Sequence, residues 1–186
     1  MTPPPAMAYW MVDDMVKNDD FERFPSRKSP RLKFFDYTAS NYYFVTICTW
    51  EKRCLFSQSG TELNQFGEIA KRSFENIPQH FPTVKVDKFV VMPNHVHGIL
   101  ILNEQNVDLS TVVGQYKSHV THQIHLIYPG CRVWQTSFHD HIIRNQADYE
   151  RIWNYIEANP ARWQEDCFYS YTENELPRWG HDPALR

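Results

Sequence analysis

The segment His95–Leu102, with the sequence HVHGILIL, constrains the fold of this chain more than any other. Side chains alternate between the two faces of a strand, so Val96 and Leu100 would lie on one face and Ile99 and Ile101 on the other. A strand that is apolar on both faces is covered on both sides. We therefore expect residues 95–102 to form a central strand of a sheet that carries other elements on each face.

Apolar patterning and turn residues predict the elements around this strand. In chain order they are a strand over 42–50, a helix over 66–77 after the N-cap Asn64, strands over 84–92 and 95–102, a helix from the N-cap Ser110 to about 127, an extended stretch within 133–143 and a final helix over 147–158. This order, β-α-β-β-α-β and then a helix, is typical of a split βαβ arrangement. We predict an α+β protein with a ferredoxin-like antiparallel sheet, helices on one face and an added C-terminal helix that carries Tyr155.

Length and charge predict one domain between two tails. The chain has 186 residues, which is enough for one domain with its own core. Residues 1–25 hold five acidic and two basic residues, so this segment accounts for the whole formal net charge of −3. We expect an acidic extension over residues 1–25, the domain over 26–167 and a tail over 168–186.

Composition argues against several classes of protein. The longest apolar run, residues 98–102, is too short to cross a bilayer, and none of the six glycines lies in a P-loop or dinucleotide-binding motif. The N-terminus shows no basic segment followed by an apolar one, and the four cysteines show no Cys-x-x-Cys spacing. We expect a cytoplasmic protein with reduced thiols and no membrane partner.

The pair His95 and His97 is the first chemical signal. The two side chains would point the same way from one strand, about 6–7 Å apart along it. Two poorly hydrated imidazoles disfavour each other's charge, and a shared divalent ion would suit them as neutral ligands. Two hydrogen-bonded core histidines are the alternative, and the spacing by itself favours that alternative.

The last predicted helix carries the second signal. Tyr155 and Asn159 are four residues apart, so they share one face of the helix. Tyr155 borders an apolar stripe formed by Tyr149, Ile152 and Ile156. Taken alone, Tyr155 is better interpreted as a core tyrosine whose hydroxyl lies at the rim.

Together, the two signals resemble the motifs of a known family. The segment VVMPNHVHGILI is similar to the histidine–hydrophobic–histidine (HUH) motif of single-tyrosine, single-strand transposases, and residues 155–160 (YIEANP) match their Tyr-Ile-x-x-Asn-Pro stretch. Residues 42–56 and 133–163 also resemble the REP-associated tyrosine transposases. The similarity covers roughly residues 30–166.

This resemblance implies a metal-dependent single-strand DNA endonuclease and strand transferase that acts on hairpin-forming repeats. Tyr155 would be the nucleophile and would form a 5′-phosphotyrosine, while His95, His97 and Asn159 would hold Mg²⁺ or Mn²⁺. The partner would be a single-stranded DNA hairpin. The chain would act as a monomer or a homodimer, and Tyr155 could serve its own metal site or that of a second copy.

Several basic and aromatic side chains remain open to interpretation. Lys117, Arg144 and Arg151 are the best candidates for phosphate contacts. Tyr116 is a second candidate nucleophile, for which we favour a packing role. Three histidines, His119, His122 and His125, recur at helical spacing. They could form a zinc site, but we favour a solvated or DNA-facing stripe.

The segment before the last helix holds a second period-two histidine pair, His139 and His141. We interpret His141 as structural or as adjacent to a phosphate. Trp134 and Phe138 are candidate core residues, with base stacking as the less favoured interpretation.

Two functions of other classes compete with the transposase-like one. A catalytically idle protein that binds nucleic acid would explain a core without excess positive charge, and would show salt-dependent hairpin binding without cleavage. A metal-dependent phosphodiesterase with a bound water as nucleophile would keep its turnover when Tyr155 is lost and fail when His97 is replaced.

Overall fold

The computed structural model describes residues 41–57, 62–103 and 107–165. The expected acidic extension, the expected C-terminal tail and Cys167 lie outside these residues. The described helices and strands are β1 (Asn41–Cys48), η1 (Trp50–Lys52), α2 (Gln65–Glu75), α3 (Ile77–His80), β2 (Val84–Met92), β3 (His95–Leu102), α4 (Leu109–His125), β4 (His139–Ile143), α5 (Gln146–Ala158) and η2 (Pro160–Glu165). None of the helices in these ranges is long and apolar enough to span a bilayer.

The four described strands form one antiparallel sheet in the order β2-β3-β1-β4. Strand β3 lies between β1 and β2, which are joined through α2 and α3, and β1 lies between β3 and β4, which are joined through α4. Each βαβ unit is therefore split by a strand of the other, which confirms the predicted ferredoxin-like α+β fold. The two central strands, β1 and β3, are the ones that carry most of the apolar sequence.

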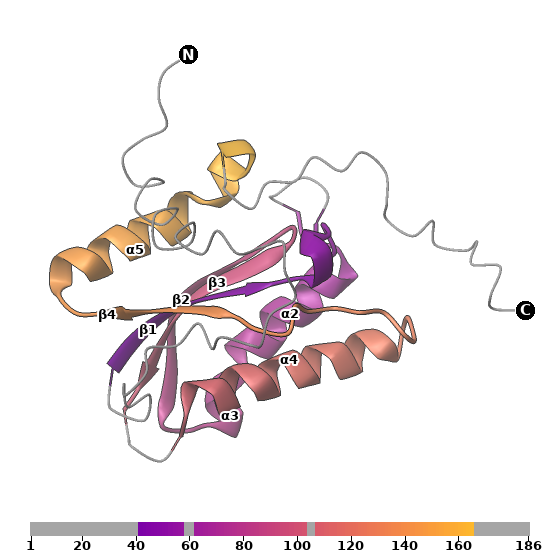
Figure 1. The fold of residues 1–186 in the computed structure, drawn as a ribbon, viewed down its shortest axis with the longest axis horizontal. Coiled ribbons are helices and arrows are strands. Elements are labelled where there is room, and N and C mark those ends of the chain that lie inside the picture. The colour runs from indigo at the N-terminus through magenta and orange to yellow at the C-terminus, as the bar shows by residue number, and fades with distance from the viewer. Residues whose placement is uncertain (1–40, 58–61, 104–106, 166–186) are drawn as a thin grey trace, which may run out of the picture.

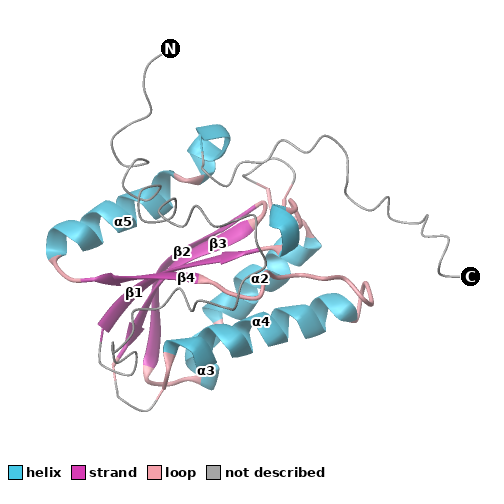
Figure 2. Ribbon diagram, viewed as in Figure 1, coloured by secondary structure: helices cyan, strands magenta, loops and turns pink. Residues whose placement is uncertain are grey.

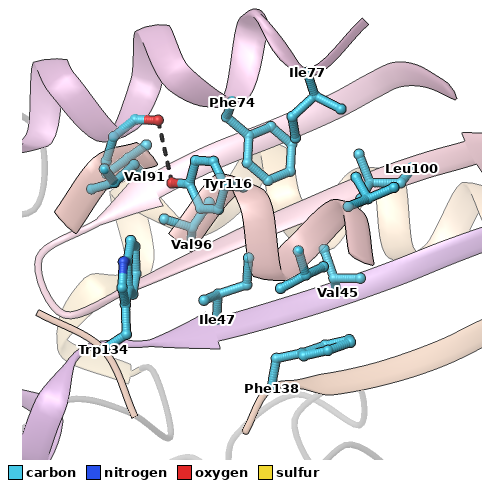
Figure 3. Packing of buried hydrophobic residues seen from close by; sticks show 14 of the residues in the cluster. Val45, Ile47, Phe74, Ile77, Val91, Val96, Leu100, Tyr116, Trp134 and Phe138 are labelled. Atoms are coloured by element: carbon cyan, nitrogen blue, oxygen red, sulfur yellow. Dashed lines mark hydrogen bonds between the residues drawn. The ribbon is translucent and has the colours of Figure 1, made fainter. Parts of the chain in front are cut away.

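Helices cover both faces of the sheet (Figures 1 and 2). Helices α2 and α4 pack on one face, and the main core lies beneath them (Figure 3). Helix α5 packs on the other face through a smaller cluster made by Phe44, Ile99, Ile143, Ile152 and Ile156. The prediction that residues 95–102 form a central strand covered on both sides is confirmed. We call the two sides the α2/α4 face and the α5 face.

The described elements differ from the predicted ones at their ends. Helix α2 begins after Asn64, whose side chain accepts from the backbone N–H groups of Phe66 and Gly67 as an N-cap should. It ends at Glu75, because the chain restarts as the short helix α3 with Pro78 in its first turn, where a missing N–H is tolerated.

Helix α4 begins at Leu109 with Asp108 at the N-cap position, so Ser110 is a first-turn residue and not the cap. This earlier start brings Leu109, which is fully buried, into the core. Within the predicted stretch 133–143 only residues 139–143 form a strand. The preceding residues bond to the end of β1, where Gln135 N–H donates to the carbonyl of Cys48, and Trp134 turns its ring into the core.

Strand β2 lies at an edge of the sheet and contains a β-bulge between Val86 and Lys88, where its register with β3 shifts by one residue. The bulge changes which face Lys88 points to. The Lys88 ammonium pairs with Glu157 and lies 4.2 Å from the ring centre of Trp153, and both partners belong to α5. The bulge therefore helps to hold α5 on the sheet.

Two glycines provide a matched test of this packing. A Cβ on Gly98 of β3 would lie 2.5 Å from the ring of Phe74 in α2, whereas a Cβ on Gly114 of α4 would meet nothing within 4 Å. We expect Gly98→Ala to lower the free energy of unfolding by about 1–3 kcal/mol through overpacking. We expect Gly114→Ala to raise it by about 0.5–1 kcal/mol, because alanine favours a helix. Urea unfolding would measure both, and equal effects of the two variants would contradict the packing described here.

Candidate active site

His95 and His97 lie at the start of β3 and point to the α5 face. Both are almost completely buried, with exposed fractions of 0% and 1%, and their ring centres are 4.3 Å apart. The rings therefore lean toward each other, because their Cα positions two apart on a strand are about 6–7 Å apart. The sequence motif thus becomes a compact pair of imidazoles inside the protein.

Each imidazole is held through its Nδ1 atom. Nδ1 of His97 is hydrogen-bonded to the hydroxyl of Thr46 at 2.8 Å, and Thr46 lies opposite His97 on the paired strand β1. Nδ1 of His95 is hydrogen-bonded to Oδ1 of Asn94 at 2.8 Å. In both rings, Nε2 is the nitrogen on the side away from the holding group.

Burial keeps both imidazoles neutral near pH 7. It lowers the pKa of His97 from its ordinary value of 6.5 to about 3. The pKa of His95 is also well below its usual range, first because of burial and then because of the positive charges that His97 and Lys52 can carry. Neutral imidazole is the form that binds metals.

Tyr155 of α5 reaches the histidine pair. Its hydroxyl oxygen lies 3.3 Å from Nε2 of His97, and its ring makes an edge contact with Phe44, with ring centres 6.2 Å apart. The residue is only partly buried, unlike the two histidines. The structure brings together the two sequence signals, which are 58 residues apart in the chain.

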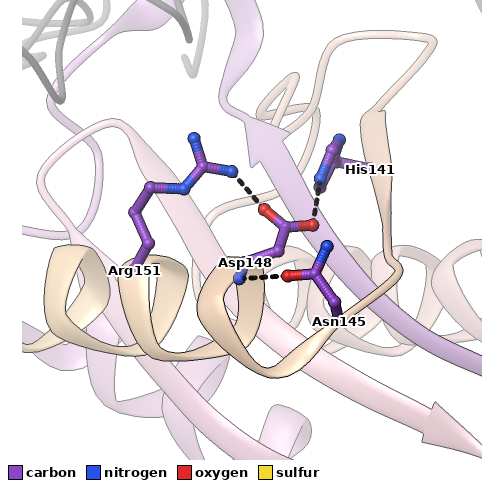
Figure 4. Close-up of polar contacts among 4 residues, drawn as sticks. All are labelled: His141, Asn145, Asp148 and Arg151. Carbon is purple, nitrogen blue, oxygen red and sulfur yellow. Dashed lines mark hydrogen bonds and ion pairs between the residues drawn. The ribbon is translucent and has the colours of Figure 1, made fainter.

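The start of α5 is fixed to the sheet by a polar cluster (Figure 4). Asn145 caps the helix by accepting from the backbone N–H of Asp148 at 2.9 Å. The Asp148 carboxylate lies 2.9 Å from Nε2 of His141 on β4 and pairs with Arg151. Burial alone would raise the pKa of Asp148, but the bonds to His141 and Arg151 lower it below its usual value. The cluster fixes the first turns of α5, and Tyr155 projects from the helix one turn after Arg151.

Asn159 completes the set of residues expected at the site. It follows α5 directly, one helical turn beyond Tyr155, and is 4% exposed. Its Oδ1 is buried without a hydrogen-bond partner among the described residues, which is costly for an amide oxygen unless a ligand satisfies it. Trp163 of η2 lies beside the histidine pair, with its ring centre 6.2 Å from that of His95.

This donor set fits a divalent cation. Two neutral imidazole nitrogens and an amide oxygen are ordinary metal ligands, and they leave positions for substrate oxygens. No group of three or more histidine, cysteine, aspartate or glutamate side chains is placed to hold a metal in the part of the chain that the structure describes. His119, His122 and His125 accordingly form no such group, and His125 instead bonds to the carbonyl of Cys131.

The predicted phosphate contacts are dispersed. Arg151 lies on α5 one turn before Tyr155, and Arg144 precedes α5, where it helps to line a groove of about 470 Å³. Lys117 lies on α4, which covers the α2/α4 face, and its ammonium donates to the carbonyls of Gln135 and Thr136. The structure therefore does not bring Lys117 to the histidine pair.

The second candidate nucleophile also lies away from the site. Tyr116 is buried in the main core, and its hydroxyl donates to the carbonyl of Ala70 at 3.2 Å (Figure 3). Burial raises the pKa of this phenol above its ordinary value. These contacts agree with a packing role for Tyr116. Trp134 and Phe138 likewise belong to the core.

Sequence reasoning missed the residues that hold the imidazoles. Thr46 interrupts the apolar strand YYFVTIC, and a polar residue inside a central strand was the available signal. Asn94 directly precedes His95, but its neighbour Pro93 suggested a turn and nothing more. His139 lies opposite Thr46 on β4, so it points to the α5 face in the same row as His97.

The depressed pKa of the buried pair makes stability depend on pH. Between about pH 6.5 and the folded-state pKa of about 3, the unfolded chain binds a proton on His97 that the folded chain does not, and the lowered pKa of His95 acts in the same direction. We expect the free energy of unfolding to fall as the pH is lowered through this window. His97→Gln should make the slope shallower by up to about 1.4 kcal/mol per pH unit. Urea unfolding at several pH values would measure it.

The matched control for this measurement is His122→Gln, at an exposed histidine of α4. It should leave the slope as in the wild type. A slope that His97→Gln leaves unchanged would show that this imidazole is not held neutral in the folded state.

Comparison with known proteins identifies the family. The family model described as IS200-like transposase matches residues 37–159, which include both histidines, Tyr155 and Asn159. A protein of Haemophilus influenzae without a described function is 35% identical over 167 residues, which cover 77% of this chain and 93% of that protein. The REP-associated tyrosine transposase of Escherichia coli K12 is 35% identical over 78 residues, which cover 42% of this chain and 45% of that protein.

A solved structure, described as a REP-associated tyrosine transposase bound to a REP hairpin, shares the fold. It aligns with a TM-score of 0.57 at 24% identity, and the alignment covers 75% of this chain and 74% of that chain. The family match extends over the whole of the described sheet and over the whole of α5. The chain therefore belongs to the family of IS200-like transposases, with REP-associated tyrosine transposases among its relatives, and its enzyme class is that of a transposase-like DNA endonuclease and transesterase.

Proposed function

We propose that this protein cleaves and rejoins single-stranded DNA with Tyr155 as its nucleophile. The observation that carries the proposal is the position of the Tyr155 hydroxyl, 3.3 Å from Nε2 of His97. A phenol with an ordinary pKa of about 10 is a weak nucleophile, so it needs a site that favours its ionised form. Tyr155 is partly buried, and its hydroxyl lies close enough to the buried histidine pair for one phosphodiester to contact both.

His95, His97 and Asn159 would hold a divalent cation, for which we propose Mg²⁺ or Mn²⁺. The neutral state of the imidazoles and the buried Oδ1 of Asn159 support this ligand set. When bound there, the cation would polarise the scissile phosphate and fix its orientation. Two imidazoles alone do not distinguish Mg²⁺ from Mn²⁺, and phosphate oxygens would complete either coordination shell.

The proposed reaction is a transesterification. The Tyr155 oxygen bonds to phosphorus while the bond from phosphorus to the 3′ oxygen breaks, which leaves a 5′-phosphotyrosine and a free 3′-OH. The proton lost by the phenol balances the proton gained by the 3′ oxygen. Because the new phosphodiester keeps the energy of the old one, attack by a 3′-OH on the phosphotyrosine rejoins DNA without ATP.

The proposed substrate is a DNA hairpin with a single-stranded flank. Support comes from the related protein whose structure is described as bound to a REP hairpin. Arg144 and Arg151 belong to the segment that leads into Tyr155, and we propose them as phosphate contacts along that path. Lys117 is not part of this path, because it lies on the opposite face of the sheet.

A covalent adduct tests the nucleophile. Wild-type protein, a labelled hairpin oligonucleotide with a single-stranded flank and Mn²⁺ should give a protein–DNA adduct that survives denaturing electrophoresis. Tyr155→Phe should abolish the adduct, because it removes the attacking oxygen. The matched control is Tyr116→Phe, which removes the hydroxyl of the other candidate tyrosine and should keep the adduct.

Each of the competing functions predicts a different result. An adduct that persists in Tyr155→Phe would exclude this nucleophile. A phosphodiesterase that uses water would cleave the DNA without forming an adduct. Its cleavage would persist in Tyr155→Phe and be lost in His97→Ala. Salt-dependent hairpin binding with no cleavage by the wild type would indicate a protein that only binds DNA.

A mixing experiment tests which subunit supplies the tyrosine. Within the described chain, Tyr155 reaches the histidines of the same chain, so we propose that it acts on its own site. Tyr155→Phe and His97→Ala proteins should each be inactive, and their mixture should also form no adduct. An adduct from the mixture would show that the tyrosine of one copy serves the histidines of another.

A further inference from the structure

The side chain of Asn94 joins two parts of the site that the proposed mechanism treats separately. It is completely buried, and its amide is hydrogen-bonded on both sides. Its Nδ2 donates to the backbone carbonyl of Lys52 at 3.0 Å, and its Oδ1 is 2.8 Å from Nδ1 of His95. The same residue therefore contacts one candidate metal ligand and the turn that follows β1.

These two bonds determine the tautomer of His95. A backbone carbonyl only accepts, so the Asn94 atom that faces Lys52 must be the NH₂ group. The other amide atom is then the oxygen, which also only accepts, so Nδ1 of His95 must carry the proton. In a neutral imidazole the lone pair is then on Nε2. The hydrogen bonds of Asn94 therefore select this single form of the neutral ring.

Thr46 cannot play the same part for His97. A hydroxyl both donates and accepts, so its 2.8 Å bond to Nδ1 of His97 is compatible with either tautomer. Of the two groups that hold the imidazoles, only the Asn94 amide determines which ring nitrogen carries the proton. A ligand nitrogen oriented in this way by a neighbouring group binds metal more tightly than one that is free to exchange its proton.

The turn on the other side of Asn94 has an unusual backbone. Glu51 and Lys52 both have positive φ angles, of 54° and 55°, a conformation that non-glycine residues rarely adopt. The turn is bonded to Asn94 Nδ2 and to Thr49, whose hydroxyl lies within hydrogen-bond distance of the carbonyls of Arg53 and Asn94. The bond from Nδ2 to the Lys52 carbonyl holds the Asn94 amide in the orientation that turns its Oδ1 to His95.

We propose that Asn94 is a positioning residue that fixes His95 as the Nδ1–H tautomer, with its Nε2 lone pair available to the cation. The inference rests on the proposed function for the role of the cation. The tautomer of His95 does not depend on that function, and it can be measured in the protein without metal or DNA.

Long-range ¹H–¹⁵N NMR of the imidazoles tests the tautomer. Wild-type protein without metal should show His95 protonated on Nδ1. Asn94→Asp should keep this form, because a carboxylate oxygen also accepts from Nδ1, whereas Asn94→Ala should give a mixture of tautomers. A wild-type His95 protonated on Nε2, or an unchanged tautomer in Asn94→Ala, would overturn the proposal. If Asn94→Ala does not fold, the wild type and Asn94→Asp still decide it.

Titration with Mn²⁺ alone tests the consequence for binding. Asn94→Ala should weaken Mn²⁺ affinity by about 10–100-fold, the range typical of losing a group that orients a metal-binding histidine. The matched control is Asn76→Ala, at an exposed asparagine next to α2, which should bind Mn²⁺ as the wild type does. Equal Mn²⁺ affinity of Asn94→Ala and wild type would contradict the positioning role.

These readouts separate the two proposals. A changed tautomer and weaker Mn²⁺ binding in Asn94→Ala, together with no adduct from the wild type, would leave the positioning role standing and remove the proposed reaction. An adduct from the wild type with an unchanged tautomer in Asn94→Ala would support the proposed reaction and remove the positioning role.

Discussion

The packing of α5 on the second face of the sheet is the contact on which the candidate site depends. Ile152 and Ile156 lie against Phe44 and Ile99, and this small cluster places Tyr155 over the histidine pair. The cluster is much smaller than the core under α2 and α4, so the polar ties of α5 to β2 and β4 matter for its position. Apolar burial holds α5 on the sheet, and the polar contacts set its orientation. Together they determine where Tyr155 of α5 lies relative to His97 of β3.

Burying polar groups in this way is costly, and the structure offsets the cost group by group. Buried imidazoles, amides and hydroxyls need hydrogen bonds, and Thr46 and Asn94 supply them to the two histidines. The Oδ1 of Asn159 is one buried atom for which the described protein atoms leave that need unmet. A buried polar atom that is held in place without a partner is preorganised for a ligand and needs little rearrangement to accept it.

Periodicity predicted most of the fold, since strands 84–92 and 95–102 and the final helix need only local patterns. Local patterns do not reveal which face of a sheet a helix covers. Lys117 was therefore a reasonable phosphate contact in the sequence, although α4 lies across the sheet from Tyr155. The sequence did not predict the roles of Thr46 and Asn94 for a related reason. The register that pairs Thr46 with His97, and the two hydrogen bonds of the Asn94 side chain, exist only in the folded chain. The meeting of Tyr155 with His97 was expected from the family resemblance, and the roles of these residues remain proposals.

The bulge in β2 has a consequence for assembly. Strand β2 is one of the two outer strands of the described sheet, and an outer strand offers unpaired backbone groups to any neighbouring chain. A bulge disrupts the even spacing of those groups. The charges of the adjacent Lys85, Asp87 and Lys88 further disfavour pairing with a strand of another molecule. The same irregularity that aims Lys88 at α5 thus disfavours continuation of the sheet from one molecule into the next along β2.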